Sequence, residues 1–283
     1  MAGRITELAP QPGYASVQPA ALTEDGVAVG DSMAANGWAG RATLWGASGT
    51  PVDLPPVPGF PGYAYSSVAA INAHGIAVGY SYGAPGTVTA LGFGRPSAVN
   101  DAGAVIGGAS YWDPAGNVVP LEGGGTATDL DDAGTAVGSS GFHAAKWDAA
   151  GHLTVLDTTW KFSSAAEIGA DGTIYGEVVG EDGKSRPARW DPAGRLTVFP
   201  AAGDARTWFT TADDSGSALV ETSPGGFFVW GPGGRVTPLP LPAEGAYCRA
   251  TDLNDRGAVT GECPVPEQNS HAVRWDLPVI GNW

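Results

Sequence analysis

One short pattern recurs seven times along the 283 residues of this chain and constrains its fold more than any other feature. In each copy an apolar run ends in a turn that resembles Asn-Asp-x-Gly, and an aromatic residue follows within about twenty residues. The turn glycines are Gly26, Gly75, Gly103, Gly134, Gly172, Gly216 and Gly257, followed in order by Trp45, Phe93, Trp112, Trp147, Trp190, Trp230 and Trp275. The gaps between these glycines are 49, 28, 31, 38, 44 and 41 residues, which centre on the period of about 40 to 50 residues that is typical of propeller blades.

Each copy contains four strand-like segments bounded by turn residues. The first segment, for example residues 66–71, is rich in Ser, Ala and Thr, which suits the crowded innermost strand of a propeller blade. The second follows the turn glycine, the third ends on the aromatic residue, and the fourth follows a second tight turn such as that at residues 191–194. Because hydrophobic periodicity mostly reports burial, we predict that the repeated aromatic residues pack in the core between sheets.

These segments predict an all-β fold, a seven-bladed β-propeller that occupies residues 1–283 as a single domain. Six blades are the alternative, because the copy that contains Phe93 has no room for a fourth segment before the next copy begins. Residues 3–8 resemble residues 194–199, whereas little sequence follows Trp275. We therefore expect the N-terminal strand to complete the last blade, which would leave no unpaired closing edge.

The pattern resembles the HAF-repeat family of bacterial proteins, whose units read roughly Ile-Asn-x-x-Gly-x-x-Val-Gly-x-Ser followed by His-Ala-Phe-x-Trp. Residues 71–81 match the first half of that unit, and His143 and His271 match the histidine of the second half. The resemblance spans the chain and implies four-stranded blades like those of WD-repeat proteins. It implies no function, because one fold hosts many activities. Many HAF-type proteins are thought to be exported.

Charge narrows the range of partners. The chain carries 14 Lys and Arg against 29 Asp and Glu, a formal net charge of −15. Such a surface repels nucleic-acid phosphates and anionic membranes, so we expect neither nucleic acid nor a membrane as a partner. No apolar run reaches the length of a membrane span, and the first residues lack the apolar core of a signal peptide. We therefore expect a cytoplasmic monomer, or a secreted one if a leader has been removed.

Both tight turns of each copy fall at one edge of the predicted sheets, and the variable connections fall at the other. Because function concentrates on variable loops carried by a rigid scaffold, we place a single pocket at the second edge, at the mouth of the predicted channel. Five residues after four of the turn glycines stand the candidate catalytic acids Asp31, Glu177, Glu221 and Glu262. The candidate substrate-binding residues near this edge are Trp38, Tyr65, Tyr80, Trp160, Phe162, Trp208, Tyr247 and Arg249, the last an expected cross-strand neighbour of Glu262.

Converging carboxylates raise one another's pKa values and suit either proton transfer or the capture of a cation. The leading hypothesis is therefore a cofactor-independent lyase, isomerase or cyclase that acts on one small organic molecule, held by the aromatic residues while the acids move protons. The alternatives are a non-catalytic binder of a cationic or amphipathic ligand and a protein-interaction scaffold. All four histidines occupy repeat positions, so we expect neither a Ser-His-Asp triad nor a metal site.

The two cysteines flank the last turn. If Leu253 pairs with Ala258 across this turn, the same register places Cys248 opposite Cys263. Directly opposed strand residues have Cβ atoms about 4.5–5.5 Å apart, which is close enough for a disulfide after small adjustment. Because a reducing cytoplasm keeps thiols reduced, we expect two thiols.

Overall fold

A computed structural model describes residues 8–23, 27–36, 40–46, 48–54, 65–82, 88–89, 95–200, 205–223, 226–240, 248–253, 258–265 and 268–276. At several of these positions, including most of residues 258–276, only the backbone is described. The described residues form β-strands and one short 3-10 helix, η1 (Glu122–Gly124). None of the helices in this part of the chain has the length and apolar character that a membrane span requires.

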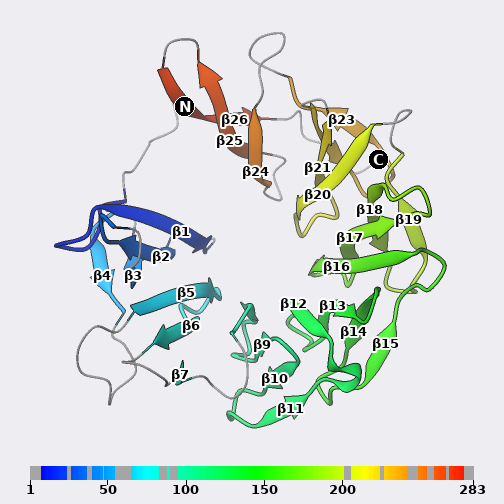
Figure 1. The fold of residues 1–283 in the computed structure, drawn as a ribbon, viewed down its shortest axis with the longest axis horizontal. Coiled ribbons are helices and arrows are strands. Elements are labelled where there is room, and N and C mark those ends of the chain that lie inside the picture. The colour runs from blue at the N-terminus through cyan, green and yellow to red at the C-terminus, as the bar shows by residue number, and fades with distance from the viewer. Residues whose placement is uncertain are drawn as a thin grey trace. The chain divides into compact units, whose positions relative to one another are not determined.

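The strands form seven sheets that follow one another along the chain (Figure 1). Every pairing with a described register is antiparallel. Five sheets have four strands: β1 (Ser16–Leu22), β2 (Ala28–Met33), β3 (Gly40–Trp45) and β4 (Pro51–Asp53); β8 (Ala98–Val99), β9 (Val105–Gly107), β10 (Ser110–Trp112) and β11 (Val118–Pro120); β12 (Thr126–Leu130), β13 (Ala136–Ser140), β14 (His143–Trp147) and β15 (Leu153–Val155); β16 (Phe162–Ile168), β17 (Ile174–Val179), β18 (Ser185–Trp190) and β19 (Leu196–Val198); β20 (Arg206–Ala212), β21 (Ala218–Ser223), β22 (Gly226–Trp230) and β23 (Val236–Pro238). Two have three strands: β5 (Tyr65–Ile71), β6 (Ala77–Tyr82) and β7 (Val88–Thr89); β24 (Arg249–Leu253), β25 (Ala258–Val265) and β26 (Gln268–Asp276).

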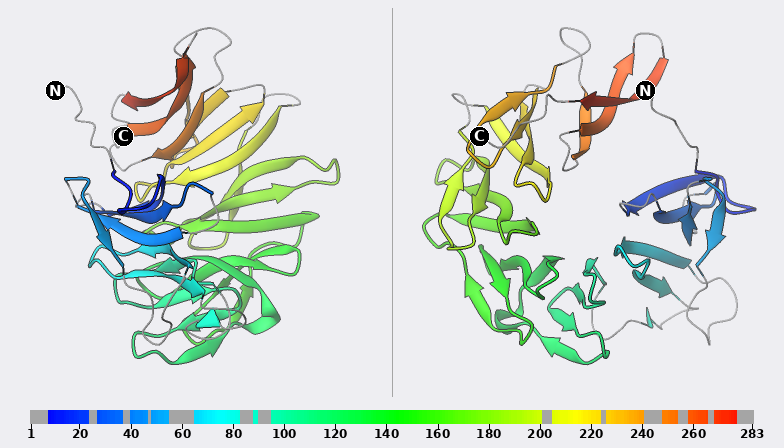
Figure 2. Two further views of the ribbon diagram at one scale, coloured as in Figure 1. Left: turned by 60° about the vertical axis from the view of Figure 1, so that its left-hand side comes forward. Right: turned by 180° about the vertical axis from the view of Figure 1, so that it is seen from behind.

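The chain divides into two compact units, residues 1–136 with 147–153 and residues 137–146 with 154–283. Within the first unit, β5 packs against β2 and β3, and β8 packs against β5 and β6. Within the second unit, β20 packs against β17 and β18, and β24 packs against β20 and β21 (Figure 2). In each unit, therefore, the first strand of a sheet packs against the sheet before it, as expected of successive propeller blades.

The asparagines of the Asn-Asp-x-Gly turns make hydrogen bonds both within a turn and between neighbouring turns. Within one turn, Asn72 Oδ1 accepts a hydrogen bond from the amide of Ile76 (2.8 Å), and Gly75 has a φ of +79°, which glycine adopts without strain. Between turns, Asn72 Nδ2 donates to the carbonyl of Asn100 (2.8 Å), and Asn100 Nδ2 donates to the carbonyl of Asp131 (2.9 Å). The motif thus shapes each turn and also connects it to the turn of the next sheet.

A β-bulge interrupts the first strand at an equivalent place in five sheets. The register shifts between Pro19 and Ala21, Val68 and Ala70, Ala165 and Glu167, Phe209 and Thr211, and Ala250 and Asp252. A bulge inserts an extra residue and bends the strand. The second strand carries Gly30, Gly79, Gly176 and Gly261 opposite four of these bulges and Val220 opposite the fifth. In four sheets, therefore, a glycine of the second strand lies opposite the bulge of the first strand.

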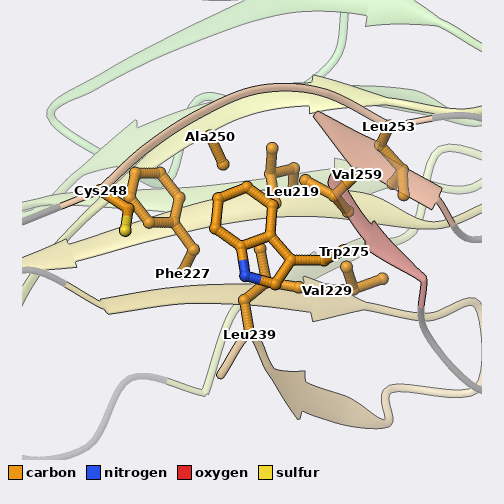
Figure 3. Close-up of a cluster of buried hydrophobic side chains, with 9 residues drawn as sticks. All are labelled: Leu219, Phe227, Val229, Leu239, Cys248, Ala250, Leu253, Val259 and Trp275. Carbon is orange, nitrogen blue, oxygen red and sulfur yellow. The ribbon is translucent and has the colours of Figure 1, made fainter. Parts of the chain in front are cut away.

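The repeated tryptophans are buried, as predicted. Their exposed fractions do not exceed 9% for Trp45, Trp112, Trp147, Trp190, Trp230 and Trp275, and Phe93 lies outside the described residues. Figure 3 shows the arrangement around Trp275. Its ring lies among Ala250, Leu253 and Val259 of its own sheet and Leu219, Phe227 and Val229 of the preceding sheet. The tryptophan therefore fills the space between two sheets.

Three of these tryptophans also use their indole N–H in the same way. Each donates to a carbonyl in the segment that precedes the first strand of its own sheet. The pairs are Trp45 with Ala9 (2.7 Å), Trp147 with Glu122 (2.9 Å) and Trp275 with Pro240 (2.9 Å). Each of these tryptophans therefore holds the segment that leads into its sheet, in addition to packing between two sheets.

The predicted blade count is tested only in part. The β5–β7 sheet has three strands in the described residues, and residues 90–94, where a fourth segment of the second copy would begin, lie outside them. Residues 4–8 are predicted to pair with the strand that ends at Trp275; residues 4–7 lie outside the described residues, and Leu8 is not part of a strand. The all-β fold with four-stranded antiparallel sheets is confirmed, and closure by seven blades stays a prediction.

The register between β24 and β25 differs from the predicted one near the turn but agrees with it at Arg249 and Glu262, the residues next to the two cysteines. Leu253 pairs with Val259 rather than Ala258, and the bulge between Ala250 and Asp252 then shifts the register so that Arg249 faces Glu262. Cys248 is disulfide-bonded, and Cys263 is the only other cysteine in the chain. The expectation of two thiols is therefore not met.

Candidate ligand-binding surface

The four predicted acids occupy equivalent positions in their sheets. Asp31, Glu177, Glu221 and Glu262 stand opposite Gln18, Ser164, Trp208 and Arg249 of the first strands. The equivalence predicted from the spacing is therefore confirmed for the backbone, and so is the cross-strand pairing of Arg249 with Glu262. The side chain of Glu262 is not among those described.

Asp31 directs its carboxylate at the next sheet instead of at solvent. Its Oδ2 accepts a hydrogen bond from the Ser67 hydroxyl (2.6 Å), and its Oδ1 accepts one from the amide of Val68 (3.1 Å). Val68 directly precedes the bulge of β5. Burial raises the pKa of Asp31 above its ordinary value, and the two hydrogen bonds oppose part of that shift. Asp31 thus connects two sheets by satisfying a backbone amide beside a bulge.

Glu177 does the same in the second unit. Its Oε1 accepts a hydrogen bond from the amide of Phe209 (2.9 Å), the residue that precedes the bulge of β20, and its Oε2 accepts one from the Ser185 hydroxyl (2.5 Å). The partners of Asp31 and Glu177 in the next sheet lie 32 to 37 residues farther along the chain. Both acids therefore have a defined structural role, in which each holds a backbone amide of the next sheet.

Removal of the Asp31 carboxylate is expected to destabilise the protein. Asp31→Ala leaves the buried amide of Val68 without its acceptor, which costs about 1–3 kcal/mol of unfolding free energy. Asp31→Asn is expected to cost less, because its amide oxygen still accepts from Val68 and its amide nitrogen donates to the Ser67 hydroxyl. Urea unfolding at pH 7 measures both, and wild-type stability in Asp31→Ala would contradict the assigned role.

A comparison of the wild type with Asp31→Asn tests the raised pKa of Asp31. Because the pKa lies above 3.8 in the folded state, the folded protein holds this proton more tightly than the unfolded chain does. The stability of the wild type relative to Asp31→Asn is therefore expected to fall as the pH rises through and above about 4. A difference that grows between pH 4 and pH 7 would contradict this direction.

Two of the predicted aromatic residues each meet an arginine. The Arg95 guanidinium lies 4.5 Å from the ring centroid of Tyr80 in the first unit, and the Arg186 guanidinium lies 5.6 Å from that of Trp160 in the second. Such cation–π contacts cover part of each ring. Trp38 and Tyr247 lie outside the described residues, and only the backbone of Tyr65 is described.

The second unit presents an aromatic surface, which we define as Phe142, Phe162 and Trp208. Their exposed fractions are 69%, 38% and 36%. The rings of Phe142 and Phe162 meet edge to face with centroids 5.4 Å apart. Phe162 and Trp208 stand near the starts of the successive first strands β16 and β20, at the edge opposite the tight turns. Sequence analysis selected Phe162 and Trp208 but missed Phe142, whose only signal was an aromatic residue at the tip of a hairpin.

The sequence analysis expected acids at this edge, and exposed charges of both signs are found there: Glu181 and Asp182 of the β17–β18 turn are exposed, and so are several basic residues. Arg206 and Trp208 are alternate residues of β20 and are both exposed, and Lys161 and Arg249 are exposed as well. Glu177, the acid predicted here, is bonded to Ser185 and the backbone instead. In the described part of the chain, no group of three or more His, Cys, Asp or Glu side chains is placed to hold a metal ion.

Comparisons with known proteins agree on the fold. Virginiamycin B lyase from Staphylococcus aureus is similar over 86% of this chain and 90% of its own, with 13% identity and a TM-score of 0.52. YCF48 bound to a D1 peptide is similar over 92% and 96%, with 14% identity and a TM-score of 0.51. A puromycin hydrolase variant is similar over 96% of this chain and 55% of its own, with 16% identity and a TM-score of 0.51.

These similarities define a class of fold. Antiparallel four-stranded sheets, each packed in its unit on the sheet before it, together with these neighbours show a fold of the β-propeller type. Identities this low show a shared fold and no shared activity. No protein-family model matches the sequence, and no curated protein sequence matches it.

Proposed function

We propose that this protein binds a small organic molecule with an aromatic or apolar ring and an acidic group, and that the aromatic surface of the second unit is its site. Phe142, Phe162 and Trp208 offer ring faces and edges for stacking. Arg206 and Arg249 supply guanidinium groups that suit a carboxylate. This ligand differs from the cationic or amphipathic one considered from the sequence, because Lys161 Nζ lies 5.7 Å from the ring centroid of Phe162 and Arg206 stands two residues before Trp208 in β20.

The observation that carries the proposal is the edge-to-face pair of exposed rings Phe142 and Phe162, at the same strand edge as exposed Trp208. These three are the aromatic members of the described large hydrophobic residues that are exposed. The remaining four, Val52, Ile76, Val118 and Val155, are aliphatic residues on different strands or turns. Single exposed aliphatic residues are ordinary, whereas grouped aromatic residues mark binding surfaces.

Catalysis is the second candidate, a cofactor-independent lyase, isomerase or cyclase that acts on the bound molecule. The cross-strand pairing of Glu221 with Trp208 favours it, because this places an acid next to the aromatic surface. The shared fold with virginiamycin B lyase is consistent with such an activity. Asp31 and Glu177 hold strand amides, so Glu221 and Glu262 are the stronger candidates for proton transfer.

Ligand-observed NMR with a set of small aromatic carboxylic acids and their primary amides tests the proposal. We expect acids to bind more tightly than the matched amides, and Arg206→Gln to reduce that difference. Trp208→Ala is expected to weaken both classes at least tenfold. Val118→Ala, which removes an exposed aliphatic residue in the first unit, serves as the control and is expected to bind like the wild type.

Three results would contradict the proposal: no fragment binds, Trp208→Ala binds like the wild type, or amides bind as tightly as acids. Any fragment that binds is then incubated with the wild type and with Glu221→Gln, and its fate is followed by mass spectrometry. Conversion that Glu221→Gln abolishes while binding persists would support catalysis. Unchanged fragments would support binding alone.

A further inference from the structure

A cavity of about 620 Å³ lies in the second unit at the edge that carries the tight turns. Its walls come from the β16–β19 sheet, which contributes Asp171, Tyr175, Arg189 and Thr197, and from the turns of the next sheet, which contribute Gly216 and Pro232. None of the residues of the aromatic surface lines it. Sequence analysis assigned this edge a purely structural role. Its volume is that of a typical small-molecule site.

Tyr175 is an exception within the repeat. The residue three positions after the turn glycine is aliphatic in five of the other six copies, Val29, Val78, Ile106, Val137 and Leu219, and is Thr260 in the last. These aliphatic residues are buried in the core, and Tyr175 is likewise only 1% exposed. The tyrosine therefore adds a hydroxyl at a position where the fold needs only an apolar side chain.

The hydroxyl of Tyr175 has no hydrogen-bond partner among the described residues. A buried hydroxyl without a partner is destabilising, so such a group calls for an explanation. Burial also raises the pKa of Tyr175, which keeps the hydroxyl protonated and able to donate. A Cβ at Gly216 would stand 3.7 Å from the hydroxyl oxygen and 3.2 Å from Pro232 Cβ. Gly216 has the left-handed φ (+92°) of a turn glycine, and this turn lies next to the hydroxyl.

Arg189 provides a fixed cation beside this hydroxyl. It is the cross-strand partner of Tyr175, and its guanidinium lies 4.5 Å from the ring centroid of Trp230. Its Nη1 donates to the carbonyl of Gly231 (2.9 Å) and its Nη2 to that of Pro232 (2.6 Å). These bonds use two of the five N–H groups of the guanidinium and hold the side chain in one place.

Other lining residues supply acceptors. Asp171 and Asp191 line the cavity together with the hydroxyl of Thr197. The Asp171 carboxylate accepts from the amide and the hydroxyl of Thr173 (2.8 and 2.9 Å), which orients it. Carboxylate oxygens accept more than one hydrogen bond each. The cavity thus combines fixed donors with fixed acceptors and carries both signs of charge.

We propose that this cavity binds a neutral polyhydroxylated molecule of the size of a mono- or disaccharide. Arg195 and Asp191 are paired with each other (Nε to Oδ2, 2.6 Å), so an anion would meet Asp171 and a cation would meet Arg189. Neutral hydroxyl groups both donate and accept, so they satisfy the two sets of walls together. Pro192, Leu196 and Pro232 offer apolar contact for the C–H face of a sugar ring. Because only one copy carries the tyrosine, the site occurs once and does not repeat from sheet to sheet.

Saturation-transfer NMR with D-glucose and maltose, and with the charged analogues glucosamine and glucuronate, tests the site. We expect at least one neutral saccharide to bind and both charged analogues to bind more weakly. Tyr175→Phe removes only the hydroxyl and is expected to weaken saccharide binding at least tenfold without lowering Tm. Thr197→Trp, which places a bulky ring at an exposed wall residue, is expected to abolish binding.

Tyr111→Phe is the matched control, because Tyr111 is a buried tyrosine of the first unit that does not line the cavity. It is expected to bind within twofold of the wild type. The proposal is overturned if neither neutral saccharide binds, if Tyr175→Phe binds like the wild type, or if a charged analogue binds more tightly than its neutral parent. The aromatic surface plays no part in these outcomes.

Discussion

Replacement of Trp190 by alanine is expected to lower the free energy of unfolding by about 3–5 kcal/mol, as large-to-small changes of buried aromatic residues do. Trp190 is fully buried. It packs with Val137 and Ala144 of the preceding sheet and with Ala165 and Ile174 of its own. The change leaves a cavity between two sheets that the strands, held in register by hydrogen bonds, cannot close.

Trp208→Ala is the control for Trp190→Ala, because it removes a tryptophan that is not in the core. Trp208 is 36% exposed and stands outside the repeated aromatic position, so its loss is expected to cost less than about 1 kcal/mol. Chemical unfolding of both variants measures the contrast. Equal losses would mean that Trp208 is part of the core, and the aromatic surface would then lose one of its three members.

A single methyl group at Gly176 is expected to destabilise the protein by about 1–3 kcal/mol or more, as overpacking does. A Cβ at this position would lie 2.0 Å from the Ser164 carbonyl oxygen and 2.9 Å from Ala165 Cα. Both contacts are with backbone, so β16 must move as a whole and the bulge must change. Gly176→Ala is therefore expected to shift the midpoint of urea unfolding well below that of the wild type.

Gly233→Ala provides the matched control in the same unit. No atom lies within 4 Å of a Cβ at Gly233, and its φ is not in the left-handed region. We expect this variant to stay within about 0.5 kcal/mol of the wild type. If Gly176→Ala behaved like Gly233→Ala, the close approach of the bulged strand would not be what requires glycine there.

The parts of the fold that were predictable are those governed by local chemistry. A turn such as that at Asn72 and Gly75 needs a side-chain acceptor and a left-handed φ, so Asn and Gly at these positions predict the turn. A tryptophan repeated at the end of a strand-like segment indicates burial on that strand's inner face. Four-stranded sheets and a tryptophan core follow from these two signals alone.

The candidate site was less predictable, because neighbours distant in sequence decide it. Spacing correctly put Asp31 and Glu177 in equivalent positions, but their partners Val68 and Phe209 belong to the next sheet. Both acids were therefore expected on an open rim and instead hold strand amides. The error in pairing Leu253 has the same kind of origin, since a bulge is invisible in a pattern of alternating residues.

By itself, the sequence determined where strands begin and end, which residues turn the chain and which rings are buried, because these depend on backbone preference and on alternation along one strand. Only the tertiary structure decided what the polar and exposed side chains do. Packing of one sheet on the next brings Phe142 to Phe162, turns Glu177 toward a backbone amide and leaves the Tyr175 hydroxyl beside a cavity. Contacts between sheets depend on register and on bulges, and neither is encoded in the spacing of the repeat.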